Sequence, residues 1–316
     1  MKKLNIQLLL TIALTLLFAG NGNAEDATPY SFLSTALSPR AAGIGGSGLT
    51  LENDAGSVFL NPALIYTNVG KNFSATFQKH LLDINSGNAT YIFKDTTYGR
   101  FAVSAVYTNY GSFDYYNEYG DATGGSFSGN LVALSGTYAN EIAERLYGGV
   151  TVKFIFNQIE NMNGFAFAVD AGLLYKLDDE RTNIGFSILN AGTEIKKFES
   201  STSRIPLDVR LGFNHRLQGL PLLFNIGFNH LGQDGDFGER FANINVGGEL
   251  YFGDYVRVRV GYDNYIRKNY AASSSKGLSG FSVGAGVVTD VVNVDYSINV
   301  VTGDLLLHRF GVSLEF

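Results

Sequence analysis

The chain has 316 residues and a formal net charge of −6, with no cysteine, no tryptophan, 38 glycines, 18 tyrosines and 24 phenylalanines. The lack of cysteine excludes disulfides, thiol catalysis, thiolate metal sites and a lipid-modified N-terminal cysteine. The acidic balance argues against nucleic-acid binding and against a basic patch for lipid head groups. The glycine and aromatic content is typical of a membrane β-barrel.

The first 24 residues are predicted to form a signal peptide. Lys2 and Lys3 supply a positive start, residues 8–18 form an apolar core, and a small-x-small pattern ends at Ala24. This core is too short to span a membrane, and no later stretch is apolar enough for a transmembrane helix. We therefore expect export, cleavage after Ala24 and a mature protein in the cell outer membrane.

Residues 25–70 show no regular alternation and are rich in small residues. The glycine run over 43–48 permits close backbone packing, and Pro62 ends whatever element precedes it. We expect 25–70 to form a plug, or hatch, inside a barrel made by residues 71–316. The glycine run also suggests a phosphate-binding loop, but the Lys and Ser or Thr of such a loop do not follow at the required spacing.

From Asn72 onward apolar and polar residues alternate, which is the period of a strand with lipid on one face and water on the other. Single-chain bacterial barrels use an even number of antiparallel strands, and about 14 segments alternate here. The predicted fold class is all-β, a transmembrane antiparallel barrel with an N-terminal plug. The expected strands are 72–79, 87–93, 99–110, 128–138, 146–157, 164–175, 182–188, 206–215, 222–229, 241–252, 256–265, 278–289, 292–300 and 308–316.

Charged residues fix the face of each strand that points inward. At mid-depth on the lipid face Arg257 would cost about 2–4 kcal/mol and Asp295 somewhat less, so both are expected to face the lumen. We favour a salt-bridge network that fastens the plug over a selectivity filter, the alternative use of these charges. The expected inward residues are Arg210, Arg257, Arg259, Arg309, Asp170, Asp208, Glu249, Asp263, Asp295 and Glu315.

The connections between expected strands sort by length. Those at 94–98, 139–145, 176–181, 216–221, 253–255 and 290–291 are short, whereas those at 111–127, 189–205, 230–240 and 266–277 are long. Short turns on one side and long loops on the other are typical of outer-membrane barrels, with the short turns in the periplasm. The chain would then end on the periplasmic side.

The last strand, 308–316, ends on Phe316 and carries apolar residues on one face only. Pairing with the first strand would remove a free hydrophobic edge. The segment resembles the terminal strand of bacterial outer-membrane barrels, whose final aromatic is read by the assembly machinery, so Phe316 is a candidate assembly signal. The alternative is an edge strand of a soluble β-sandwich, which the alternation along the rest of the chain disfavours.

We expect no catalytic residue, no cofactor and no metal. The histidines His80, His215, His230 and His308 lie near expected strand ends, and no G-x-S-x-G nucleophile motif is present. The acidic stretch 234–239 could offer oxygens to Ca²⁺, but it lacks the ligand spacing of an EF-hand loop, so a polar surface loop is favoured.

Several motifs resemble the PorV/PorQ family of outer-membrane barrels, and the resemblance covers essentially the whole mature chain. The motifs at 109–113 and 118–124 are closer to PorQ. The Asn-Pro-Ala motif at 61–63 is shared with FadL-type transporters of hydrophobic compounds, which are fourteen-stranded barrels with an N-terminal hatch. The other matching motifs are Phe32-Leu33, 38–46, Asn53-Asp54-Ala55 and 309–312.

The resemblance implies a non-enzymatic component of type IX secretion that binds secretion or attachment-complex proteins at its extracellular loops. The alternative is a FadL-like passive transporter, with a hydrophobic ligand between plug and wall. From the motif we transfer only a role in plug packing, to Arg40, Gly45, Gly46, Asn61 and Pro62. Arg40 is expected to pair with inward carboxylates.

Hydrophobic residues in the expected outer loops favour protein binding. Leu81-Leu82 and 305–307 are assigned to such loops, and the long loop 111–127 carries several aromatics. Aromatic anchors in a polar surround are typical of binding hot spots, although girdle or self-packing aromatics are the alternative. The candidate partner-binding residues are Phe113, Tyr115, Tyr116 and Tyr119.

Overall fold

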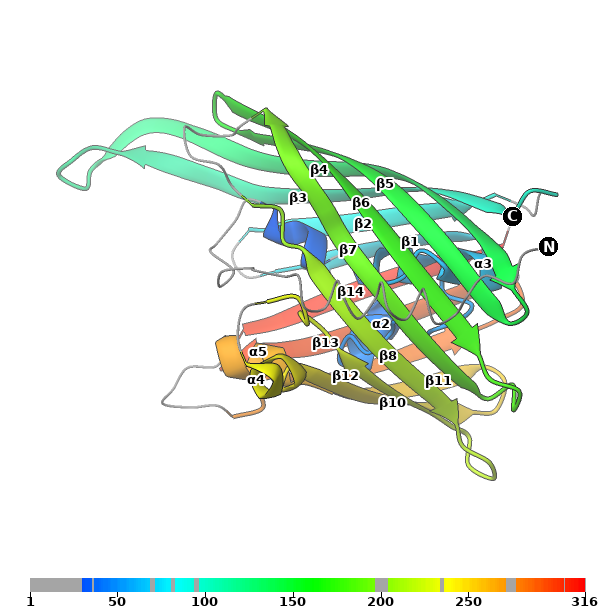
Figure 1. The fold of residues 1–316 in the computed structure, drawn as a ribbon. Coiled ribbons are helices and arrows are strands. Elements are labelled where there is room, and N and C mark those ends of the chain that lie inside the picture. The colour runs from blue at the N-terminus through cyan, green and yellow to red at the C-terminus, as the bar shows by residue number, and fades with distance from the viewer. Residues whose placement is uncertain are drawn as a thin grey trace.

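The computed structural model describes residues 30–35, 37–68, 72–80, 83–93, 97–196, 204–233, 236–270, 277–303 and 305–315. The predicted signal peptide, Leu81-Leu82 and Phe316 lie outside the described residues. Fourteen antiparallel strands form one closed barrel (Figure 1), which confirms the predicted fold class and strand number. Among the described residues, no helix is long and apolar enough to cross a membrane.

Each strand pairs with its neighbours in sequence, and β1 pairs with β14 from Phe73 opposite Leu314 to Lys79 opposite His308. This closure removes both sheet edges. The strands are β1 Phe73–Lys79, β2 Asn85–Ile92, β3 Arg100–Tyr116, β4 Ala122–Ala143, β5 Leu146–Ile159, β6 Met162–Lys176, β7 Thr182–Lys196, β8 Asp208–Arg216, β9 Leu222–Phe228, β10 Ile244–Phe252, β11 Val256–Asp263, β12 Phe281–Val288, β13 Val292–Thr302 and β14 Leu305–Leu314.

The inward and outward faces follow the alternation of the sequence. On β5, Phe154 and Phe156 are 46% and 47% exposed on the outer face, whereas the alternate residues Lys153 and Ile155 are buried on the lumen side. Arg210, Arg259 and Arg309 are likewise buried with their side chains in the lumen, as expected from the cost of placing charge on an apolar face.

Some expected loops are strands. β3 has 17 residues and β4 has 22, so the predicted loop 111–127 is wrong: it is a β-hairpin with a turn at 117–121 that projects beyond the barrel wall (Figure 1). Pairing continues because aromatic rings meet across the strands, with Phe113 and Phe127 centroids 5.4 Å apart. β7 also extends to Lys196, and 305–307 belong to β14 rather than to a loop.

The connections after β9 and β11 are long and those after β8, β10 and β12 are short, as expected, but β5 and β6, which meet at the same end as the long connections, are joined by residues 160–161 alone. The long connections after β9 and β11 contain the short helices α4 (Phe237–Phe241) and α5 (Asn264–Asn269). We call the end of the barrel that carries these helices the long-loop end, and the end at which β14 finishes the short-turn end. Of the expected loop 189–205, residues 189–196 belong to β7, so the loop prediction is wrong there, and residues 204–205 precede β8 at the long-loop end.

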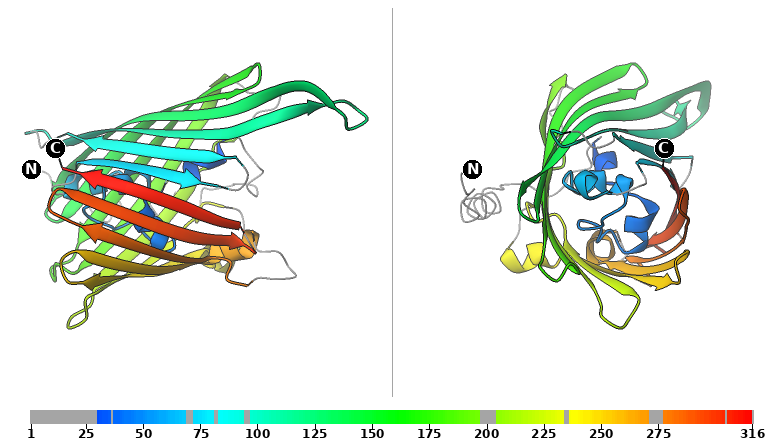
Figure 2. Two further views of the ribbon diagram at one scale, coloured as in Figure 1. Left: turned by 180° about the vertical axis from the view of Figure 1, so that it is seen from behind. Right: turned by 90° about the vertical axis from the view of Figure 1, so that its right-hand side faces the viewer.

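The N-terminal segment lies inside the barrel (Figure 2). It contains η1 (Ser31–Thr35), α2 (Pro39–Gly43), η2 (Ala55–Phe59) and α3 (Leu64–Thr67). Side chains cap two of these turns, because the Ser38 hydroxyl accepts from Ala41 N and the Asp54 carboxylate accepts from Gly56 N. The division into a plug over 25–70 and a barrel over 71–316 remains a prediction.

Glycines on the inner wall make room for the segment's backbone. A Cβ added at Gly149 would lie 2.5 Å from the carbonyl carbon of Pro62, and one added at Gly212 would lie 2.8 Å from Cβ of Leu49. A Cβ at Gly261 would collide with the backbone of Gly45. These inner-wall glycines therefore leave the space that the segment's backbone occupies in the lumen.

Substitution of one such glycine is expected to displace the segment. Gly261→Ala places a methyl group against backbone atoms, which cannot swing aside, whereas a Cβ at Gly136 meets no atom within 4 Å. We expect wild type and Gly136→Ala to conduct few ions in planar bilayers and Gly261→Ala to conduct markedly more. A folded Gly261→Ala barrel that stays closed would contradict this, as would a large steady conductance in the wild type.

Candidate functional site

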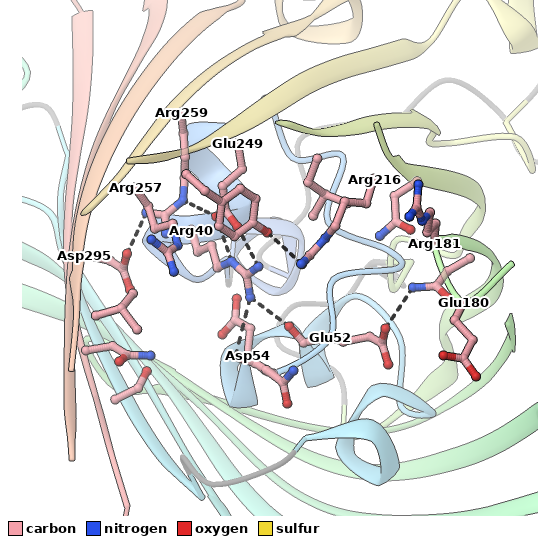
Figure 3. Close-up of a pocket in the computed structure, with 18 residues that line it drawn as sticks. Arg40, Glu52, Asp54, Glu180, Arg181, Arg216, Glu249, Arg257, Arg259 and Asp295 are labelled. Atoms are coloured by element: carbon pink, nitrogen blue, oxygen red, sulfur yellow. Dashed lines mark hydrogen bonds and ion pairs between the residues drawn. The ribbon is translucent and has the colours of Figure 1, made fainter. Parts of the chain in front are cut away.

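Arg40 of α2 joins the segment to the wall through a buried ion-pair network (Figure 3). Its Nη2 and Nε donate to the Glu249 carboxylate at 2.8 and 2.9 Å. Arg259 on β11 donates to the same carboxylate at 2.6 Å and to Asp295 on β13 at 2.6 Å. Arg40 Nη1 also donates to the Glu52 carbonyl at 2.8 Å. The segment thus completes a chain of four alternating charges.

Burial and pairing act in opposite directions on Arg40. Burial alone would lower the pKa of its guanidinium, but the Glu249 carboxylate more than offsets burial and holds this pKa well above its ordinary value. Glu249 and Arg259 are each 1% exposed while Arg40 is in place. A buried ion pair stabilises the fold little more than apolar residues of the same volume would. Removal of one partner is nevertheless costly, because it leaves the other charge buried and unpaired.

A polar cavity of about 430 Å³ lies beside this network toward the short-turn end. Its wall carries five arginines and five carboxylates, which gives no net charge for steering an anion or a cation. Tyr251 lies between two of the arginines, with the guanidinium carbons of Arg216 and Arg257 at 4.9 and 4.5 Å from its ring centroid. The charged residues of the wall are Arg40, Arg181, Arg216, Arg257, Arg259, Glu52, Asp54, Glu180, Glu249 and Asp295.

On β2–β6 the inner wall carries a cluster of buried apolar residues, which alternate with buried polar residues such as Thr108, Lys153 and Asn157. Tyr30, Phe32 and Leu33 of the segment pack against it, and each is at most 8% exposed. The Tyr30 hydroxyl donates to Glu194 on β7 at 2.8 Å, and burial together with that carboxylate raises the pKa of Tyr30. The wall residues in this cluster include Ile92, Val106, Leu131, Ala133, Ile155, Ala166 and Ala168.

The predicted plug residues lie along the contact between segment and wall. Gly45 and Gly46 have φ of 71° and 77°, the left-handed region that glycine favours, and Gly45 lies against β11. Asn61 donates from Nδ2 to the Leu173 carbonyl of β6 at 3.0 Å, and Pro62 lies against Gly149. These positions suit a packing role, which remains a prediction, as does that of Arg40.

The histidines have structural partners at their strand ends. His80 is hydrogen-bonded to Ser86 at 2.8 Å and His215 to Thr182 at 2.8 Å, and burial lowers the pKa of His80 to about 4. The His230 ring stacks on Tyr265, and His308 Nδ1 is bonded to the Tyr296 hydroxyl at 2.7 Å. Asp234 and Gly235 of the acidic stretch lie outside the described residues. Within the described residues, no group of three acidic, His or Cys side chains could hold a metal.

The predicted partner-binding aromatics all lie on the projecting β3–β4 hairpin. Tyr116 and Tyr119 are 64% and 81% exposed, whereas Phe113 and Tyr115 pack against Phe127. Sequence reasoning missed the apolar cluster of the inner wall, because an Ala or Val on the water-facing side of a strand carries no distinct signal. The one hint of this cluster in the sequence is the Phe32-Leu33 pair, which matched only as part of a family motif and carries no predicted role.

The fold is similar to that of solved hydrocarbon channels. The Pseudomonas putida toluene transporter TodX matches with a TM-score of 0.63 and 12% identity, over 89% of this chain and 98% of its own. The CymD monoaromatic hydrocarbon channel matches with a TM-score of 0.58 and 10% identity, over 92% of this chain and 99% of its own. A Pseudomonas aeruginosa FadL homologue matches with a TM-score of 0.54 and 11% identity, over 89% of this chain and 98% of its own. At these identities the likeness concerns the fold alone.

No protein-family profile and no curated protein sequence matches the chain. TodX is named as a toluene transporter and CymD as a hydrocarbon channel. The fold is therefore FadL-like, which agrees with the expectation drawn from the Asn-Pro-Ala motif. The resemblance to PorV/PorQ has no counterpart among these matches.

Removal of the Arg40 guanidinium should loosen the segment. Arg40→Ala leaves buried Glu249 with one cation instead of two, and breaking a buried pair typically costs about 3–5 kcal/mol. We expect faster proteolysis within 37–68 and a lower melting temperature of the folded barrel. Arg216→Ala is the matched control, because Arg216 lines the same cavity but bonds the Tyr251 hydroxyl. Equal sensitivity of the two variants would count against the anchoring role of Arg40.

Proposed function

We propose that the protein is a non-enzymatic outer-membrane barrel through which hydrophobic small molecules pass passively. The observation that carries the proposal is the buried apolar cluster on the inner wall of β2–β6. Lumen faces of outer-membrane barrels are ordinarily polar, so an apolar cluster on such a face requires a specific explanation. The FadL-like fold, shared with transporters of toluene and other monoaromatic hydrocarbons, supports the same function.

The arrangement of the lumen fits a selective rather than an open pore. Tyr30, Phe32 and Leu33 cover the apolar wall, and burial of such side chains stabilises by about 1.5–3 kcal/mol each. A hydrophobic molecule offers the wall the same interaction, so it can replace these side chains at little net cost, whereas an ion cannot. The segment over 25–70 would then act as the plug, with the short-turn end in the periplasm.

A second candidate function is protein binding at the long-loop end, the role implied by the PorV/PorQ resemblance. The specific observation in its favour is the β3–β4 hairpin, which projects from the wall and exposes Tyr116 and Tyr119. Under this proposal the protein would serve type IX secretion or cell-surface attachment by holding a partner outside the membrane. The two functions use different parts of the molecule and can be tested separately.

Opposite changes in the apolar cluster should change uptake in opposite directions. Phe32→Ala removes a segment side chain that covers the wall and is expected to raise uptake of labelled toluene several-fold in cells that express the barrel. Ala168→Phe adds a bulky side chain to the same cluster and should reduce uptake toward that of cells without the barrel. The outer-face variant Phe101→Ala is the control.

The transport proposal fails if the wild-type barrel gives no uptake above cells that lack it. It also fails if Phe32→Ala and Phe101→Ala behave alike. Phe32→Ala keeps the test decisive should Ala168→Phe not fold, because its expected effect is a gain rather than a loss.

A further inference from the structure

The β3–β4 hairpin continues beyond the wall as a two-stranded ribbon, which we define as Ser112–Tyr116, the turn 117–121 and Ala122–Ser128. β2 pairs with β3 only as far as Asn85 opposite Asn109, and β5 pairs with β4 only from Ile159 opposite Gly129. In the described part of the chain no third strand therefore pairs with the ribbon. Free strand edges of this kind are templates for strand addition by another chain.

The tip of the ribbon is held in one conformation. The Asn117 side-chain oxygen accepts from Tyr119 N at 3.0 Å and from Asp121 N at 2.9 Å, and Asn117 N donates to the Asp121 carbonyl at 2.9 Å. These bonds fix the turn and present Tyr116 and Tyr119, which are 64% and 81% exposed. A fixed turn lowers the entropy cost of binding, because its backbone is already ordered.

The base of the ribbon is also braced. Phe113, Tyr115 and Phe127 stack on one face, with ring centroids 5.2–5.4 Å apart, and the Tyr115 hydroxyl donates to Glu160 at 2.6 Å. These aromatics pack against one another, which fits the self-packing alternative for them. The two tyrosines near the tip do not share in this cluster.

The charge of the ribbon indicates what it binds. No lysine or arginine occurs between Arg100 and Arg145, whereas Asp114, Glu118 and Asp121 all lie on the ribbon. An acidic element is repelled by anionic lipid head groups and attracted by basic protein surfaces. The free edges and the charge together favour an extended protein segment over a lipid.

We propose that the ribbon is the docking surface for a partner protein that presents an extended basic segment. Tyr116 and Tyr119 would anchor the segment, and the three carboxylates would pair with its lysines or arginines. The inference rests on the second proposed function and names the chemistry of the partner. It is independent of transport, because the ribbon lies outside the closed wall.

The test places a photo-crosslinking phenylalanine analogue at position 119 of the full-length protein in its native cells. We expect it to capture a protein, and mass spectrometry of the cross-linked peptide should show a segment with net positive charge. Neutralisation by Asp114→Asn, Glu118→Gln and Asp121→Asn together should lower the yield about tenfold, because the charge pairs are lost. Neutralisation of Glu141 and Glu144, at the other end of β4, should leave the yield unchanged.

Three outcomes would overturn the proposal. Capture of lipopolysaccharide alone, or of nothing, would remove protein docking from the ribbon. Capture of a neutral or acidic segment, or a yield that the triple neutralisation does not change, would reject the basic partner while leaving protein binding in place. Toluene uptake and heat-modifiable gel mobility, measured in the same variants, separate these outcomes from failure of transport or of folding.

Discussion

The buried contact between Arg40 and Glu249 is the constraint on which the rest of the lumen depends. Glu249 and Arg259 are brought together by the register of β10 and β11, in which they are directly opposite. Arg40 reaches them only because inner-wall glycines let α2 approach the sheet. A barrel with larger side chains at Gly247 and Gly261 would have no space for Ile44 and Gly45. Glu249 would then lack the ion pair that Arg40 supplies.

This anchoring divides the lumen into two environments. Toward the short-turn end the walls are charged, polar and held to the segment by ion pairs. On β2–β6 the wall carries an apolar cluster, which Phe32 and Leu33 cover through contacts that have no direction, and Tyr30 adds a hydrogen bond to Glu194. Ion pairs with fixed geometry hold one half in place, whereas apolar contacts can be exchanged for others of similar area. The proposed passage of hydrophobic molecules uses that difference.

The sequence predicted the wall well and the lumen in part. Alternation and the cost of charge on an outer face fixed the number of strands and the inward direction of Arg259 and Asp295. The ribbon was assigned to a loop because its Gly and Ser residues weaken the alternation, although cross-strand aromatic pairs maintain it. Which carboxylate pairs with Arg40 could not be predicted, because that choice depends on how a segment without periodicity turns inside the barrel.

Fluorescence offers the most direct test of hydrophobic binding at the apolar wall. The chain contains no tryptophan, so Phe32→Trp introduces a single indole reporter at the wall, and Phe101→Trp gives a matched reporter on the outer face. Titration with bromobenzene, a hydrophobic quencher, should quench the Phe32→Trp variant saturably, and toluene should compete. For Phe101→Trp we expect quenching that rises without saturation, because bromobenzene partitions into the surrounding detergent or lipid. The same unsaturable quenching of Phe32→Trp would contradict the account.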